Sequence, residues 1–299
     1  MRDPFGREVT NLRLSVTQRC NLNCVYCHGE GEVLGSTGEM TASEIGRIVQ
    51  VASQMGMHKL KLTGGEPLMR SDLSQIISSA GRYMGEVSLT TNGTLLAPRA
   101  AELKEAGLDR VNISLDTLDP AKYRQITGKD CLGEVLDGVE AAVRSGLRPV
   151  KLNMVVLAGI NEQEIERMIA FSKEAGVILQ LIEFESGFAT SPDESYHYDL
   201  HPIEEELARR AIRVKERRMQ RRKKYWVPNE VEVVRGMHNT RFCANCTRIR
   251  VTSDGKIKPC LLRNDNLVDI LTPLRSGASD TDLTKRFEKA ISLREPYWR

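Results

Sequence analysis

The chain contains 299 residues, which is enough for one large barrel-type domain with a small appendage or for two ordinary domains. Its residues are 40% hydrophobic and 28% charged, as in a soluble globular protein, and its net charge of +3 is too small to imply a nucleic-acid partner. The first residues, MRDPFGREVTN, include no apolar signal segment, and no later run is long enough for a membrane helix. We therefore expect a cytoplasmic protein with no membrane partner.

Short β-rich runs alternate with helical patterns between about residues 10 and 185. The predicted strands cover residues 11–17, 58–63, 86–91, 110–116, 149–156 and 177–184. Six consecutive βα units predict a parallel sheet with right-handed crossovers. Because no seventh or eighth unit is visible, we expect an α/β fold of the incomplete (βα)6 TIM-barrel type, with an open doubly wound sheet as the alternative.

The predicted strands have one apolar and one polar face when alternate residues are compared. The polar face carries Arg13, Lys61, Thr90, Asn112, Ser114, Lys151 and Asn153. A fully packed barrel would fill its interior with branched apolar residues, and burying a charge is costly unless an anion or water meets it. The pattern therefore predicts a ligand site inside the barrel. The alternative is an antiparallel sheet with a solvated polar face.

The βα alternation stops near residue 185, which separates an expected barrel domain, 1–185, from a C-terminal domain, 186–299. In the second part, the stretch from Arg209 to Lys224 holds ten Lys or Arg residues and one acid, Glu216. Such a run could contact nucleic acid or phosphates. Its interleaved apolar residues instead favour the solvated face of a strand or hairpin.

Six of the seven cysteines form two triads, Cys20, Cys24 and Cys27, and Cys243, Cys246 and Cys260. This spacing is typical of metal or cluster ligands in a reducing compartment, whereas Cys131 stands alone and is interpreted as a packed small residue. Iron–sulfur clusters and structural zinc usually take four protein ligands, so each triad lacks one. Either each site keeps an open coordination position, or zinc is completed by His28 in the first and by His238 in the second.

The first triad follows the first predicted strand, at the edge where parallel α/β folds bind ligands. The next βα loop reads TGGEP, Thr63 to Pro67. Its glycines allow close approach of the backbone to a ligand, and the Glu66 carboxylate could accept a hydrogen bond from an amino group. The same loop could also be only a turn that precedes the helix near Ser71.

The second triad surrounds a predicted hairpin. Asp254-Gly255, between two alternating runs, is typical of a two-residue turn. Pairing outward from that turn places Val251 opposite Lys258 and returns Cys260 to the other two thiols of its triad.

Two arginines, Arg248 and Arg250, lie two residues apart on the first strand of this hairpin and project to one face. Two guanidinium groups on one face suit phosphate oxygens through forked hydrogen bonds.

The C-x3-C-x2-C triad with TGGEP one strand later resembles the signature of the radical S-adenosylmethionine (SAM) superfamily. Nearly the whole chain is similar to one family within it, the GTP 3′,8-cyclases, which begin molybdenum cofactor biosynthesis. The segments that carry the resemblance include NLRLSVTQRCNLNCVYC, KLKLTGGEPLMRSDL, AGLDRVNISLDTL and FCANCTRIRVTSDGKIKPCL. The last of these, C-x2-C-x-R-x-R with a third cysteine separated from Cys246 by thirteen residues, distinguishes this family from radical enzymes that act on peptides.

The resemblance implies two [4Fe–4S] clusters, held by Cys20, Cys24 and Cys27 and by Cys243, Cys246 and Cys260. SAM would complete the first cluster, beside Tyr26, Gly65, Glu66 and Ser114. The implied GTP contacts are Arg13, Lys61, Thr90, Lys151, Arg248, Ile249 and Arg250, with Arg248, Arg250 and Lys151 as catalytic residues. Gln180 and Glu185 stand where family members have an arginine and a methionine, so no role is assigned to them.

The implied reaction is that of a lyase that converts GTP to 3′,8-cyclo-7,8-dihydro-GTP. Cleavage of SAM would yield a 5′-deoxyadenosyl radical, which takes the ribose 3′ hydrogen so that the carbon radical attacks C8 of guanine. The implied partners are a reductase or ferredoxin-type electron donor and the pathway enzyme that converts the product to cyclic pyranopterin monophosphate, and a homodimer is left open. The alternatives are a radical SAM enzyme with another substrate and a non-enzymatic iron–sulfur or zinc protein that binds nucleic acid.

Overall fold

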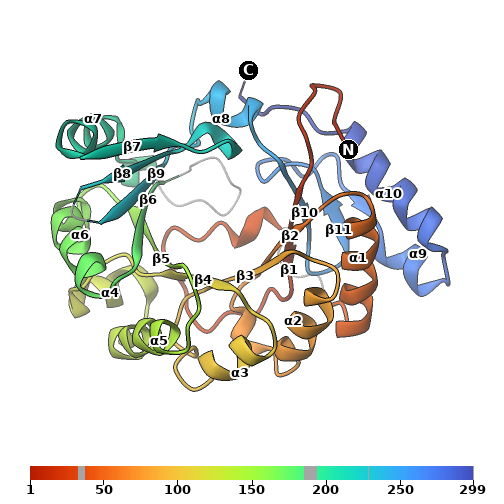
Figure 1. Cartoon of the computed structure of the whole chain (residues 1–299), viewed down its shortest axis with the longest axis horizontal. Coiled ribbons are helices and arrows are strands. Elements are labelled where there is room, and N and C mark those ends of the chain that lie inside the picture. The colour runs from red at the N-terminus through yellow and green to blue at the C-terminus, as the bar shows by residue number, and fades with distance from the viewer. Residues whose placement is uncertain (33–37, 185–193, 228, 299) are drawn as a thin grey trace.

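The computed structural model describes residues 1–32, 38–184, 194–227 and 229–298 (Figure 1). Six parallel strands follow one another in space in chain order: β1 (Asn11–Ser15), β2 (Lys59–Thr63), β3 (Glu86–Thr91), β4 (Arg110–Ser114), β5 (Val150–Val156) and β6 (Ile178–Glu183). The helices between them lie on the outer side of the curved sheet: α1 (Ala42–Gln54), α2 (Leu73–Gly81), α3 (Ala100–Glu105), α4 (Pro120–Thr127), α5 (Leu132–Arg144) and α6 (Ile165–Glu174). The prediction of an incomplete (βα)6 barrel is confirmed.

The C-terminal part of the chain adds strands to both edges of this sheet. Beyond β6 come β9 (Glu230–Val234), β8 (Lys223–Trp226) and β7 (Arg213–Glu216), and beyond β1 come β10 (Arg248–Val251), β11 (Lys256–Lys258) and β12 (Val268–Asp269). β9 is parallel to β6 and β10 is parallel to β1. The described residues thus form one sheet of twelve strands. The expected domain boundary after residue 185 lies outside the described residues.

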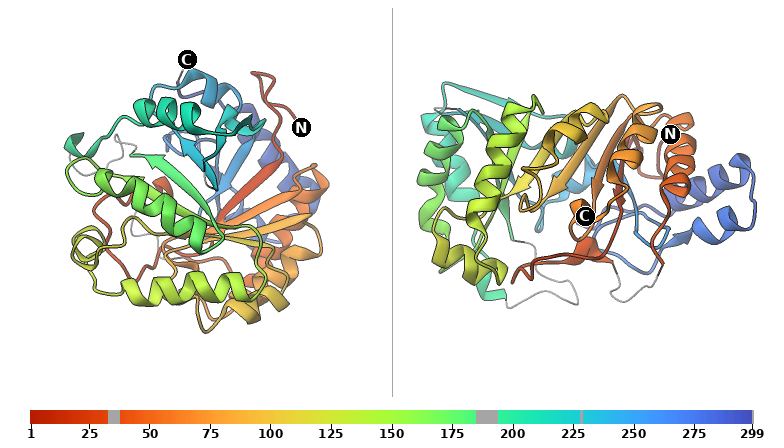
Figure 2. Two further views of the ribbon diagram at one scale, coloured as in Figure 1. Left: turned by 60° about the vertical axis from the view of Figure 1, so that its left-hand side comes forward. Right: turned by 90° about the horizontal axis from the view of Figure 1, so that it is seen from below.

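The remaining helices of the C-terminal part are α7 (His201–Arg210), α8 (Thr240–Ala244), α9 (Leu271–Arg275) and α10 (Asp280–Ser292). Two further views show α9 and α10 beside α1, on the outer side of the sheet (Figure 2). Arg47 of α1 donates a hydrogen bond from Nε to Asp280 Oδ1 at 3.0 Å, which joins α1 to the start of α10. No helix in the described part of the chain is long and apolar enough to cross a membrane.

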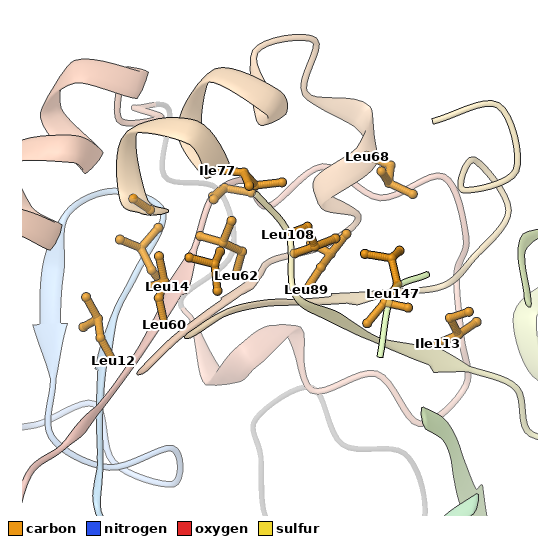
Figure 3. Close-up of a cluster of buried hydrophobic side chains, with 14 of the residues drawn as sticks. Leu12, Leu14, Leu60, Leu62, Leu68, Ile77, Leu89, Leu108, Ile113 and Leu147 are labelled. Atoms are coloured by element: carbon orange, nitrogen blue, oxygen red, sulfur yellow. The ribbon is translucent and has the colours of Figure 1, made fainter. Parts of the chain in front are cut away.

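The apolar face of the strands packs against the outer helices. Leu12, Leu14, Leu60 and Leu62 are at most 1% exposed, and Ile77 of α2 lies over them (Figure 3). Because side chains alternate along a strand, the residues between these leucines point to the opposite face. The core therefore lies between the sheet and the helices, and the inner face of the sheet is left to polar residues.

In the hairpin between β10 and β11, the observed pairing differs from the predicted pairing by one residue. Val251 lies opposite Ile257, not opposite Lys258, which faces Arg250. The loop has three residues instead of two, and its last residue, Gly255, has a φ of 75°. A left-handed residue at this position is typical of three-residue hairpin loops, which the Asp-Gly pair alone does not distinguish from two-residue turns.

Candidate active site

A cavity of about 380 Å³ opens inside the curve of the sheet. Its lining includes residues of β1 to β5 that the sequence assigned to the polar face, namely Arg13, Lys61, Thr90, Asn112, Ser114, Lys151 and Asn153. Arg248 and Arg250 of β10 and the six cysteines of the two triads also line it. Ile249 does not, because it points to the opposite face of β10 and is fully buried there. The structure therefore brings the two cysteine triads and the basic residues together around one space.

The first triad occupies the loop that leaves β1 and crosses the inside of the barrel (Figure 1). The backbone N–H of Leu22 donates to Cys20 Sγ at 3.5 Å, and that of Gly29 donates to Cys27 Sγ at 3.4 Å. Burial raises the pKa of the Cys24 thiol, so this thiol is protonated at neutral pH unless a metal binds. Coordination to a metal deprotonates a thiol, and the two N–H donors favour the resulting charge.

The second triad faces the same cavity from the C-terminal part. Cys243 and Cys246 lie at the end of α8, and Cys260 follows β11. Burial would raise the pKa of the Cys246 thiol, but the positive charges of Arg294 and Arg248 outweigh it and lower that pKa. A lowered pKa favours the thiolate form that binds metals.

Each triad offers three thiols, one fewer than the four ligands that a structural zinc ion usually takes. Among the described residues, no group of three or more His, Cys, Asp or Glu side chains is arranged to hold one metal ion. A structural zinc ion requires four ligands within about 2.3 Å of one centre, whereas each thiolate of a [4Fe–4S] cluster binds a different iron. His238, the zinc ligand considered for the second triad, packs against Trp298 with ring centroids 4.2 Å apart.

The TGGEP loop packs closely against the loop that carries the first triad. A Cβ atom on Gly65 would clash with the carbonyl oxygen of Arg19, so only glycine fits beside the cysteine loop. Glu66 is fully buried and accepts hydrogen bonds from the Thr91 hydroxyl and from the Asn92 N–H, both at 2.7 Å. Gly65 lines the cavity and the Glu66 side chain does not, so the carboxylate holds the loop in place.

Tyr26, between two cysteines of the first triad, and Ser114, at the end of β4, both line the cavity. The Tyr26 hydroxyl donates to Asp116 Oδ2 at 2.6 Å, and Asp116 Oδ1 accepts from the N–H of Val155 at 2.8 Å. Burial raises the pKa of Asp116 to about 6, although both hydrogen bonds oppose this change. The Tyr26 ring is thereby held against the ends of β4 and β5.

Two of the predicted substrate-binding arginines share a carboxylate. Glu30, which follows the first triad by three residues, forms ion pairs with Arg13 and with Arg250, the latter at 2.8 Å. Burial opposes the charge of Glu30, but the two arginines lower its pKa to about 2. The sequence interpretation missed Glu30, because only the fold shows that β1 and β10 lie side by side and that the loop after the first triad reaches both.

Lys151 also has a buried counter-charge that the sequence interpretation missed. Its Nζ atom forms an ion pair with Glu232 of β9, whose side chain is fully buried. Burial lowers the pKa of Lys151 to about 8, and Glu232 opposes this change only in part. Because β9 was not among the predicted strands, no sequence signal placed Glu232 next to β5.

The remaining cations leave the cavity positively charged. Lys61 Nζ donates to Asn112 Oδ1 at 2.9 Å, and burial together with Arg110 and Arg13 lowers its pKa. Burial and the neighbouring charges of Arg222 and Arg13 likewise lower the pKa of Arg248. Such crowding of like charges attracts an anionic ligand into the cavity.

A buried ion network ties the second triad to both ends of the described chain. Arg294 donates from Nη1 to Asp3 Oδ2 at 2.7 Å and from Nη2 to the Cys246 carbonyl at 2.8 Å. Arg7 pairs with the same carboxylate at 2.7 Å and donates to the Cys243 carbonyl at 3.0 Å. Arg294 and Arg7 therefore hold the backbone carbonyls of two cysteines of the second triad in place.

We expect Arg294→Ala to lower the free energy of unfolding by about 3 kcal/mol, because it removes one partner of a buried ion pair. It should also reduce the metal content of the second triad. The matched control is Arg263→Ala, whose ion pairs are exposed to solvent and should contribute little to stability. Urea unfolding and metal analysis test this, and equal effects of the two substitutions would contradict the assigned role.

Two family models match the chain. The Radical SAM superfamily model covers residues 14–172, and the Molybdenum Cofactor Synthesis C model covers residues 177–299. Solved structures with the same fold include that titled native anSMEcpe with bound AdoMet, with a TM-score of 0.65 and 18% identity over 95% of this chain and 81% of that one. Another is Streptococcus suis SuiB, with a TM-score of 0.68 and 15% identity over 97% of this chain and 67% of that one. The fold is that of a radical SAM protein.

Curated relatives extend this similarity to nearly full length. The relative from Pyrococcus horikoshii is 54% identical over 99% of this chain and 97% of its own length. The relative from Thermococcus kodakarensis is 52% identical over 99% of this chain and 99% of its own length. The relative from Methanothermobacter thermautotrophicus is 51% identical over 100% of this chain and 99% of its own length. All three are named probable GTP 3′,8-cyclase. The chain belongs to the GTP 3′,8-cyclase family.

Proposed function

We propose that this chain converts GTP to 3′,8-cyclo-7,8-dihydro-GTP, the first step of molybdenum cofactor biosynthesis. The observation that carries the proposal is the position of the two cysteine triads on one cavity whose remaining lining is strongly basic. A radical generated at one triad would meet, without diffusing into solvent, an anionic nucleotide held near the other. Proximity of this kind and exclusion of water are the protein's main contributions to such chemistry.

We assign the first triad to a [4Fe–4S] cluster with SAM as the additional ligand. When bound, this pair supplies a 5′-deoxyadenosyl radical that removes the ribose 3′ hydrogen. Gly65, Tyr26 and Ser114 line the same cavity as the triad and would contact SAM. Glu66 would act indirectly, because its carboxylate is occupied by the hydrogen bonds that shape the loop.

We assign the second triad to another [4Fe–4S] cluster, near which the guanine base would lie. Arg248 and Lys61 face the cavity and would receive phosphate oxygens. Arg13 and Arg250 would do so in exchange for their contact with Glu30, and Lys151 would bind while still partly neutralised by Glu232. Arg248 or Arg250 would also supply the final proton after C8 has been attacked.

We propose three properties that concern partners and location. Electrons would come from a reductase or ferredoxin-type donor, and the product would pass to the enzyme that forms cyclic pyranopterin monophosphate. We expect no nucleic-acid partner and a cytoplasmic location.

The test of the reaction uses anaerobically prepared protein with SAM, dithionite and GTP deuterated at C3′. One hydrogen leaves the ribose and one electron with one proton is gained later, so the product should be an isomer of GTP. The deuterium should appear in 5′-deoxyadenosine. Formation of 5′-deoxyadenosine without deuterium and without a GTP isomer would identify a radical SAM enzyme with another substrate, and no SAM cleavage at all would favour the non-enzymatic alternative.

The anaerobically prepared protein should contain about eight irons per chain, four in each cluster. Cys243→Ala should reduce this number to about four, because two thiolates do not retain the second cluster. Iron and zinc analysis tests the assignment. Zinc in place of iron at either site would overturn it for that triad.

A further inference from the structure

We propose that Arg222 is a further substrate-binding residue, and that its guanidinium group binds phosphate oxygens of the nucleotide. This inference rests on the proposed function and names a contact outside the predicted set. Arg222 lies between β7 and β8, directly before β8, in a segment that the sequence interpretation treated as a solvated basic face. Its residue is only 7% exposed, and it lines the cavity together with Lys151 and Arg248.

The guanidinium group of Arg222 is buried with few hydrogen bonds. Its Nε atom has no hydrogen-bond partner in the described part of the chain, and Nη1 reaches Gln180 Oε1 at 3.5 Å. Arginine has five N–H donors and is rarely buried unless it is paired, because an uncompensated charge is costly. A group of this kind in a cavity wall suits an anionic ligand.

The nearest buried carboxylate does not neutralise Arg222. Glu232 already forms ion pairs with Lys151, with Arg217 at 3.1 Å and with Lys224 at 3.4 Å. One negative charge is thus shared by three cations before Arg222 is counted. Burial lowers the pKa of Arg222 to about 10; the charge of Glu232 opposes this change only in part, and that of Arg217 adds to it.

The backbone before Arg222 is held in a strained conformation. Gln220 and Arg221 have φ values of 60° and 51°, a left-handed region that residues other than glycine seldom adopt. The N–H of Gln220 donates to the carbonyl of Asn245 at 2.9 Å, and Asn245 stands between two cysteines of the second triad. Strained backbone conformations of this kind are often found where a functional side chain is positioned. Here it turns Arg222 inward beside the second triad, while Arg218 stays outside.

The ligand chemistry that fits is an oxyanion with several oxygens. A guanidinium fork forms paired, charge-assisted hydrogen bonds with phosphate. Gln180 contacts Nη1 and Nε is buried without a partner, so the described residues satisfy few of the Arg222 donors. Arg222, directly before β8, therefore brings a positive charge next to Gln180 of β6, the position at which the resembled family has an arginine.

The test compares Arg222→Met with Arg218→Met, a control from the same segment whose side chain is 83% exposed. Binding of GTP, guanosine and inorganic triphosphate is measured anaerobically by calorimetry, on proteins whose iron content equals that of the parent. Arg222→Met should weaken GTP and triphosphate binding by about tenfold to a hundredfold, the range expected for a lost charge-assisted hydrogen bond. It should leave guanosine binding unchanged, and Arg218→Met should behave as the parent protein does.

Unchanged affinity of Arg222→Met for triphosphate would overturn the inference, and so would an equal loss for guanosine, which would indicate a structural role. The triphosphate measurement also separates this inference from the proposed function. If the parent protein fails to cyclise GTP but Arg222→Met still loses triphosphate affinity, the anion site stands and the proposed reaction does not.

Discussion

Replacing Cys24 by alanine should abolish the formation of 5′-deoxyadenosine from SAM. The thiol of Cys24 is one of three that face the cavity from the loop after β1, and the two that remain should not hold an active cluster. Because burial raises the pKa of the free Cys24 thiol, we expect that metal binding, rather than the protein environment, deprotonates it in the native enzyme. The loss should be complete, and product formation from GTP should disappear with it.

The control for this experiment is Cys131→Ala. Cys131 precedes α5, and its sulfur lies 3.7 Å from the Tyr123 hydroxyl, away from the cavity lining. This variant should keep its iron and its rate of SAM cleavage, with at most a modest loss of stability. The measurements are iron content and chromatographic quantification of 5′-deoxyadenosine. Cleavage that persists in Cys24→Ala would show that the first triad is not the cluster site.

Arg248→Ala and Lys151→Ala should each lower GTP affinity by about tenfold to a hundredfold, since each removes a charge-assisted contact of roughly 1.5–3 kcal/mol. The two residues come from β10 and β5 and line the same cavity. Both variants should retain their iron and slow SAM cleavage with dithionite, while cyclised product falls sharply. Arg241→Ala is the control, because Arg241 lies on α8 outside the cavity lining and is largely exposed.

Lys151 requires one further control, because its removal leaves the buried carboxylate of Glu232 next to the ligand. The double variant Lys151→Ala/Glu232→Gln removes both charges. If Lys151 contacts the triphosphate directly, the double variant should bind GTP weakly as well. Full recovery of affinity would mean that Lys151 only neutralises Glu232, and unchanged affinity in both Lys151→Ala and Arg248→Ala would refute a shared phosphate site.

Much of the barrel could be predicted from residues that are close in sequence. The alternation of Leu12, Arg13 and Leu14 in β1, repeated in Leu60, Lys61 and Leu62 of β2, determines which face meets the helices. Burial of apolar area and the cost of burying charge act on each strand separately, so the pattern can be interpreted one strand at a time. For the same reason, the inward position of Lys151 and the position of the first triad at the carboxyl end of β1 followed from local patterns.

The tertiary structure decided which charges meet. Glu30 pairs with Arg13 and Arg250 because β10 lies beside β1, although more than two hundred residues separate these strands in the chain. Glu232 reaches Lys151 in the same way, through the pairing of β9 with β6. Pair energies of this kind depend on distance and burial, which no local pattern contains.

The basic segment from Arg209 to Lys224 contains both residues whose exposure the sequence predicts and one residue whose burial only the tertiary structure shows. Its composition correctly indicated exposed charge for residues such as Arg213 and Arg218, but Arg222 is buried in the cavity wall. The left-handed turn at Gln220 and its hydrogen bond to Asn245 determine this difference, and both depend on a contact with a distant part of the chain. The sequence by itself therefore determined the barrel, its polar interior and the two cysteine triads. Long-range strand pairing and burial decided which cations are neutralised and which remain for the ligand.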